Sequence, residues 1–198
     1  MMPCLGQRLL IVAGVVAILS MNGAVEPVMA TSPVQTPPVA IPPGYKLDDY
    51  KSPTPPIVPG GTAVTTAQAK ALWDGNDAIF IDVLPAPIRP PGLAPDQMWA
   101  PKPRRDIPGS VWLPDVGRGA INDATDRYFQ TNLSHLTHDH KDQAIVIYCL
   151  ADCWMSWNAV KRAASYGYTK LYWYRDGTDG WTDAGLPVEL VREIPQDQ

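Results

Sequence analysis

The sequence predicts an α/β domain with one parallel β-sheet flanked by helices and a proline-rich N-terminal arm. Residues 78–83 and 144–148 are short, continuous apolar runs, as is typical of strands buried on both faces of a parallel sheet. Segments with helical spacing alternate with such runs, which indicates crossover connections. Without residues 1–30, the 198-residue chain is still long enough for a single domain with its own core.

The first expected element of this domain is a short helix over residues 67–73. Thr65 and Gln68 fit a capping box, and Gly75 stands where the helix would end. The two apolar runs are the strongest strand candidates. The other expected elements are a strand over 111–113, a helix over 126–135, a helix over 155–165, a strand over 171–174 and a short helix after the turn at 176–180.

The N-terminus has the pattern of a secretory signal peptide. Arg8 precedes the apolar run 9–20, which is about a dozen residues long, whereas a membrane span needs roughly 20. We expect cleavage after Ala30, at the end of a Val-Met-Ala sequence. The protein is then expected in the periplasm, with no membrane association after cleavage, and an uncleaved membrane anchor is the alternative.

Two further stretches are rich in proline: nine prolines lie between residues 31 and 60, and eight lie in 85–108. Proline fixes φ and lacks an N–H donor, so neither stretch is expected to form a regular helix or a central strand. The first is expected to be an extended arm, either held to the domain by the aromatic residues of 44–50 or left as a disordered linker. The second is expected to be a long irregular excursion. The expected boundaries are 1–30 for the signal peptide, 31–61 for the arm, 62–190 for the domain and 191–198 for a C-terminal tail.

Composition and motifs exclude several classes of function. The net charge of −4 does not suit a nucleic-acid-binding protein. The sequence has no glycine-rich phosphate loop and no haem-attachment motif, and no cofactor is expected. His135, His138 and His140 are interpreted as a solvated connection rather than as metal ligands, so no metal site is expected.

The strongest candidate for chemistry is Cys149, which follows the apolar run 144–148 directly. A short loop and a helix come next, and active sites of parallel sheets lie where strands end and helices begin. Backbone N–H groups there would favour a thiolate, the nucleophilic form of cysteine. Cys153 stands four positions further on, and in an oxidising compartment such a pair can close to a local disulfide. The alternative is that Cys149 is a small buried apolar residue.

Several segments together resemble the rhodanese superfamily. Asp106-Ile-Pro-Gly-Ser110 is similar to the family's His-Ile-Pro-Gly-Ala segment, and Ile145 to Cys149 matches its strand and nucleophile. The glycines and aromatic residues of 167–188 match its closing segments. The resemblance implies a rhodanese fold and a persulfide mechanism, in which the Cys149 thiolate takes sulfur from a sulfane donor and passes it to a thiophilic acceptor.

A narrower resemblance comes from the export signal, the segment 44–50 and the Cys-Trp pair at 153–154. These features are similar to the rhodanese-like proteins named for a CXXCW motif and encoded with PQQ-dependent alcohol catabolism, although here three residues separate the cysteines. The resemblance implies a small sulfur donor or a thiol partner protein, in the setting of a quinoprotein dehydrogenase system. The broader rhodanese resemblance implies that the donor binds in the loop after Cys149, at Leu150, Ala151, Asp152, Trp154, Met155 and Ser156.

This loop departs from active family members, which usually carry Arg or Lys to bind an anionic donor. Residues 150–156 contain no cation, and the Asp152 carboxylate is expected to oppose thiolate formation. We hypothesise that Arg89, Arg104 or Arg105 supplies the missing charge from the proline-rich excursion.

Two other functions stay open. One is thiol–disulfide redox chemistry, in which Cys153 resolves an oxidised or persulfidated Cys149. The other is a non-catalytic binding module that holds a partner protein, or a small aromatic cofactor such as a quinone, through Trp154, Trp157 and the excursion. At helical spacing, Trp157 is expected to belong to the core instead.

Overall fold

The computed structural model describes residues 39–94, 96–100 and 102–196. The expected signal peptide and the first residues of the expected arm lie outside these ranges. Within the described residues, no helix is long and apolar enough to cross a membrane.

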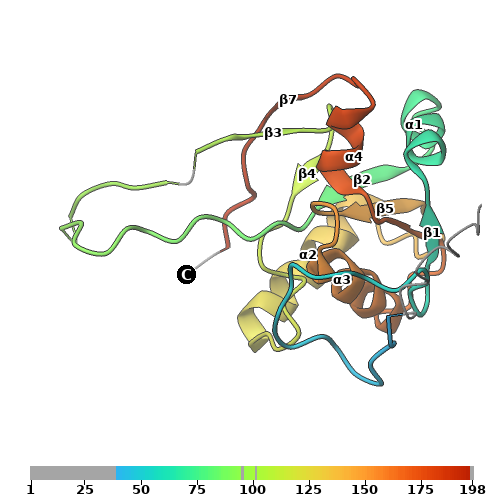
Figure 1. Cartoon of the computed structure of the whole chain (residues 1–198). Coiled ribbons are helices and arrows are strands. Elements are labelled where there is room, and N and C mark those ends of the chain that lie inside the picture. Colours follow the sequence, from blue (N-terminus) through green and yellow to red (C-terminus); the bar gives the residue numbers. More distant parts are fainter. Residues whose placement is uncertain (1–38, 95, 101, 197–198) are drawn as a thin grey trace, which may run out of the picture. The chain divides into compact units, whose positions relative to one another are not determined.

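The α/β prediction is confirmed: five parallel strands form a sheet in the order β1-β6-β5-β2-β4, and β3 and β7 form a separate antiparallel pair (Figure 1). The elements are β1 (Thr62–Val64), α1 (Thr66–Asp74), β2 (Ile79–Asp82), β3 (Arg104–Asp106), β4 (Val111–Trp112), α2 (Asp123–Thr137), β5 (Ile145–Tyr148), α3 (Trp154–Ser165), β6 (Leu171–Tyr174), α4 (Gly177–Asp183) and β7 (Glu189–Val191).

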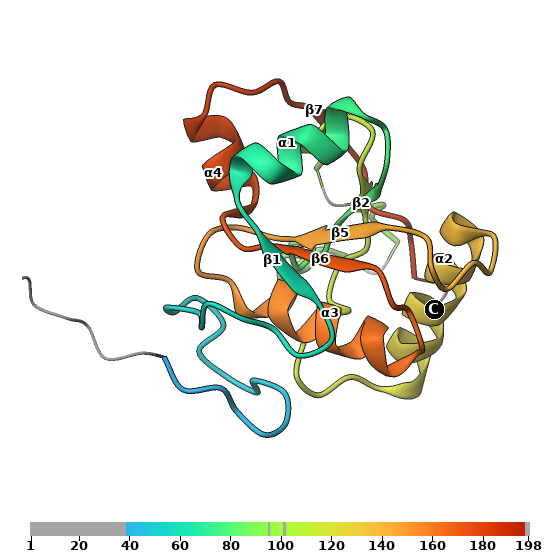
Figure 2. The same cartoon turned by 90° about the vertical axis from the view of Figure 1, so that its right-hand side faces the viewer.

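Helices cover both faces of this sheet. Figure 2 shows α1 and α4 on one side and α2 and α3 on the other. The α2/α3 side buries the larger apolar cluster, which includes Trp157 and Trp173, and the other side packs Phe80 and Trp181. Because β5 is central and apolar on both faces, all four of its residues are buried, as the continuous apolar run predicted.

Local signals account for the helix ends. Thr65 caps α1 in the expected capping box with Gln68, and α1 ends at Gly75. Helix α2 is longer than the expected 126–135, because the side chain of Asn122 caps it from further upstream and His138 ends it in the left-handed conformation.

Three short strands were not expected. β1 lies at the start of the expected domain 62–190, ahead of its first expected element, and the excursion 85–108, predicted to be irregular throughout, contains β3 near its end. β3 pairs with β7, which extends one residue beyond the expected end of the domain at residue 190. These strands are only three residues long, and β3 consists of charged residues, so neither length nor hydrophobicity marks them in the sequence.

The arm is bound to the domain over residues 39–61, which excludes the linker alternative for that part. Asn158 of α3 accepts a hydrogen bond from the Lys46 N–H at 2.9 Å and donates to the Lys46 carbonyl at 2.8 Å. The guanidinium of Arg162 stacks over the Tyr45 ring at 4.4 Å, and the Tyr50 hydroxyl accepts from the Gly119 N–H at 3.0 Å. The aromatic residues of 44–50 therefore hold the arm to the domain, as one of the two interpretations predicted.

Candidate functional site

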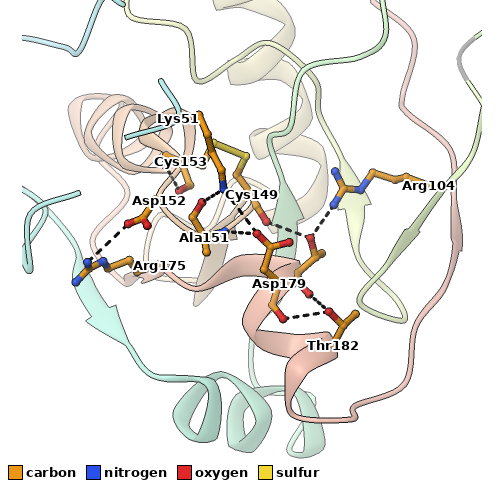
Figure 3. Close-up of polar contacts among 11 residues, drawn as sticks. Lys51, Arg104, Cys149, Ala151, Asp152, Cys153, Arg175, Asp179 and Thr182 are labelled. Carbon is orange, nitrogen blue, oxygen red and sulfur yellow. Dashed lines mark hydrogen bonds and ion pairs between the residues drawn. A yellow bond between two sulfur atoms is a disulfide. The ribbon is translucent and has the colours of Figure 1, made fainter. Parts of the chain in front are cut away.

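Cys149 and Cys153 lie at the carboxyl end of the central strand. Cys149 follows β5 directly and is fully buried, and Cys153 is the N-cap residue of α3. The Cys153 side chain makes no capping hydrogen bond. Instead the two cysteines form a disulfide with their Cα atoms 6.2 Å apart, drawn in Figure 3. The site therefore holds an oxidised dithiol where a strand meets a helix.

The loop between the cysteines is packed against the start of α4. Leu150 forms an isolated β-bridge with Gly177, and the Ala151 N–H donates to the Asp179 carboxylate at 3.1 Å. Gly177 has a φ of +54°, and a Cβ at this position would collide with the Cys149 carbonyl. Asp152 also has a positive φ, +49°, so the loop makes a tight turn.

The N-terminal arm also contacts the loop. The Tyr50 carbonyl accepts a hydrogen bond from the Trp154 N–H at 2.8 Å, and the Ser52 hydroxyl accepts one from the Trp154 indole at 3.1 Å. Lys51 pairs with Cys153 in an antiparallel bridge, and its ammonium donates to the Ala151 carbonyl. Reasoning from the sequence missed Lys51, because about 100 residues separate it from the loop and nothing local marks the contact.

Two cations reach the loop from outside it, and each faces a carboxylate. The Lys51 ammonium is 3.7 Å from Asp179, and the Arg175 guanidinium is 3.9 Å from Asp152. The Asp152 side chain is 51% exposed, so Arg175 and solvent screen the charge that was expected to oppose thiolate formation.

Of the three arginines proposed to supply a loop cation, only Arg104 is linked to Cys149 by hydrogen bonds within the described part of the chain. Arg89 donates to carbonyls of its own excursion, and Arg105 is exposed on β3. Arg104 donates to the Thr178 hydroxyl at 3.0 Å, and the Thr178 N–H donates to the Cys149 carbonyl at 3.0 Å. Its side chain is 13% exposed, which places it within the protein rather than at the mouth of the loop.

Arg104 also forms ion pairs with two fully buried carboxylates. Its Nε lies 3.0 Å from Asp82 and 3.5 Å from Asp106, and the Tyr148 hydroxyl donates to Asp106 at 2.8 Å. Burial and the adjacent Asp106 carboxylate raise the pKa of Asp82 well above its ordinary value, against the opposing effect of Arg104. Burial also raises the pKa of Tyr148, and Asp106 and Asp82 add to the effect.

The remaining predicted binding residues point into the core. Ser156 accepts a hydrogen bond from the Trp173 indole at 2.9 Å and is fully buried, as Met155 nearly is. Trp154 and Trp157 are buried against each other with ring centroids 5.3 Å apart, which confirms Trp157 as a core residue. Neither indole is exposed for the partner-binding surface that the binding-module interpretation placed there.

The histidines belong to the end of α2 and the turn that follows it. Within the described residues, no group of three or more His, Cys, Asp or Glu side chains is placed to hold a metal ion.

Comparison with known proteins identifies the family. The sequence model of the rhodanese-like domain family matches residues 65–184, and this range includes both Cys149 and Cys153. The chain belongs to the rhodanese-like domain family. No curated protein matches it.

Solved structures with a similar arrangement include three sulfurtransferases. The thiosulfate sulfurtransferase from Pseudomonas aeruginosa is 18% identical with a TM-score of 0.46; the match covers 70% of this chain and 22% of that one, so the chain spans about a fifth of that protein. The polysulfide-sulfur transferase homodimer from Wolinella succinogenes is 19% identical, with coverages of 70% and 85% and a TM-score of 0.41. The human single-domain sulfurtransferase is 17% identical, with coverages of 62% and 96% and a TM-score of 0.38.

Proposed function

We propose that this rhodanese-like protein carries sulfur on Cys149 as a persulfide and that Cys153 resolves it. The observation that carries the proposal is the disulfide between these cysteines at the carboxyl end of β5. Because Cys153 bonds to Cys149 in the disulfide, its thiolate is also within reach of Cys149 Sγ once the disulfide has been reduced and Cys149 carries a persulfide.

The proposed steps balance as follows. The reduced Cys149 thiolate attacks the outer sulfur of a sulfane donor, forms a Cys149 persulfide and releases the remainder of the donor with its electron pair. Either a thiophilic acceptor takes the outer sulfur, or the Cys153 thiolate attacks Cys149 Sγ and expels hydrosulfide. The second route leaves the observed disulfide, and a dithiol reductant returns both thiols.

The charges around the loop favour a thiol-bound donor over a small dianion such as thiosulfate. Lys51 and Arg175 could attract an anion, but Asp179 and Asp152 face them and offset most of their charge. A small dianion therefore gains little electrostatic binding energy at this site. We expect weak turnover with thiosulfate and faster persulfide formation from a thiol partner protein.

Mass spectrometry of the reduced protein after exposure to polysulfide tests the proposal. We expect one added sulfur on the peptide that contains Cys149, loss of this adduct in Cys149→Ser, and accumulation of it in Cys153→Ser. An adduct that forms equally in Cys149→Ser would refute the role of Cys149.

Thiol–disulfide exchange is a second candidate, and the disulfide itself favours it. In that case the pair would cycle with a dithiol reductant while Cys149 accepted no sulfur from any donor. The same mass measurement distinguishes the two functions, because only the first one yields an adduct in Cys153→Ser.

The setting of this chemistry is part of the proposal. The apolar run 9–20 and the residues around Ala30 support export to the periplasm, and the segment 44–50 with the Cys-Trp pair supports a link to a PQQ-dependent dehydrogenase system. Fractionation of cells that express the full chain tests the export. Growth of a deletion strain on alcohols, with and without the Cys149→Ser gene restored, tests the link.

A further inference from the structure

The ion pairs of Arg104 sit at a junction of elements that surround Cys149. Asp82 ends β2, Arg104 and Asp106 belong to β3, and Tyr148 ends β5. Asp82 and Tyr148 are direct neighbours in the register of the sheet. The cluster therefore lies next to the strand end that carries the cysteine.

A cluster with two buried carboxylates and one guanidinium is electrostatically unbalanced. Removing a carboxylate from water costs several kcal/mol unless a cation or a proton compensates it. The Asp106 carboxylate accepts from Tyr148 and from the Ile107 N–H, and Asp82 accepts from the Leu84 N–H. Arg104 is the cation that pairs with both carboxylates.

The same guanidinium is linked to Cys149 through Thr178. Arg104 donates to the Thr178 hydroxyl, and that hydroxyl lies 3.5 Å from the Cys149 carbonyl, to which the Thr178 N–H also donates. Figure 3 shows Arg104 directed toward the strand end that bears Cys149. Two hydrogen bonds thus separate a buried positive charge from the main chain of this cysteine.

We propose that Arg104 is a positioning residue that holds the main chain of Cys149 through Thr178, and that its guanidinium, although partly offset by Asp82 and Asp106, favours the Cys149 thiolate over the thiol. The inference rests on the proposed function in that Cys149 is the reactive thiol. It differs from a donor-binding role, because Arg104 is engaged inside the protein and does not face the mouth of the loop.

The test measures the pH dependence of Cys149 alkylation by iodoacetamide in the full chain with Cys153→Ser, followed by mass spectrometry of the Cys149 peptide. The plateau rate reports access to the buried sulfur, and the midpoint reports thiolate stability. In Arg104→Gln we expect the midpoint to rise by up to about one pH unit, because the variant removes a buried cation whose charge the two carboxylates offset only in part.

Other variants separate charge from structure. Arg104→Lys keeps the charge, so we expect its midpoint to stay near that of the parent. Asp106→Asn keeps the shape of the cluster and removes no positive charge, so its midpoint should not rise. The matched control is Arg105→Gln on the same strand, which should leave the midpoint unchanged. Lys51, Asp152, Arg175 and Asp179 also surround the loop and are the same in all variants.

The inference is overturned if Arg104→Gln leaves the midpoint unchanged, if Asp106→Asn raises it as much as Arg104→Gln does, or if Arg104→Lys fails to restore it. Should Arg104→Gln not fold, Arg104→Lys and Asp106→Asn are compared instead. If Arg104 only maintained the structure of the cluster, both variants would raise the alkylation midpoint, whereas the proposal expects a rise in neither. None of these outcomes depends on sulfur transfer, which the polysulfide experiment tests separately.

Discussion

Asn158 holds the N-terminal arm to α3, and replacing it with leucine should release the arm. Its side chain is fully buried and forms three hydrogen bonds: from the Lys46 N–H, to the Lys46 carbonyl and to the Gly117 carbonyl. Leucine has a similar size and no polar atoms, so Asn158→Leu leaves the Lys46 N–H and the Lys46 carbonyl of the docked arm without their partner. The Gly117 carbonyl also loses its partner, but it belongs to the domain and is affected in the docked and the open arm alike. At about 1 kcal/mol for each of the two arm groups, docking of the arm loses about 2 kcal/mol.

Limited trypsin digestion measures this loss directly. Trypsin cuts after Lys46 only when the arm opens, so a loss of about 2 kcal/mol raises the cleavage rate on the order of 30-fold while opening and closing stay fast. Asn132→Leu in α2 is the matched control, since Asn132 makes one hydrogen bond to the Tyr128 carbonyl of its own helix. Cleavage of Asn158→Leu within about threefold of the control would refute the reasoning, because the arm would then be held by other contacts.

Three further predictions concern the cysteine loop and the core. Removing the disulfide with Cys149→Ser and Cys153→Ser should lower the free energy of unfolding by about 2 kcal/mol or less, because the closed loop is short; urea denaturation measures it, and a loss far above this would show a larger structural role. Burial raises the pKa of Tyr174 to about 12, so the folded state keeps a proton that the unfolded state releases above about pH 10. Stability should therefore fall as the pH rises from about 10 toward 12, and Tyr174→Phe should flatten that fall in urea denaturation; an unchanged slope would contradict the assignment. Gly177→Ala should cost at least about 1 kcal/mol more than Gly185→Ala, since both glycines have positive φ but a Cβ meets the Cys149 carbonyl only at 177; equal losses would show that the loop yields freely.

The strand–cysteine–helix unit was predictable because its signals are local. The run before Cys149 is apolar at every position, so only burial on both faces satisfies it, and the helix after Cys153 has regular spacing. Likewise, Thr65 and Gln68 mark the start of α1, because the capping box joins two residues only three positions apart. In each case a few neighbouring side chains carry the information.

The surroundings of the cysteines were not predictable in the same way. Lys51, Thr178 and Arg104 come from three separate segments, and only the folded sheet brings them to one loop. The sequence suggested Arg104 as a cation for this site, but it did not reveal that Asp82 and Asp106 hold the side chain inside. Residues 154–156 follow Cys153 and were assigned to donor binding, yet helix geometry turns Trp154 and Ser156 toward the core.

The docking of the arm has a consequence for the order of folding. The hydrogen bonds between Lys46 and Asn158 join residues 112 positions apart, so the arm can dock only after α3 has formed and the intervening chain has been closed into a loop. Cys149 and Cys153 are four positions apart and can pair as soon as that helix begins. During folding, an oxidant can therefore react with the two thiols before Lys51 of the arm pairs with Cys153. We expect the disulfide to form before the arm docks over it.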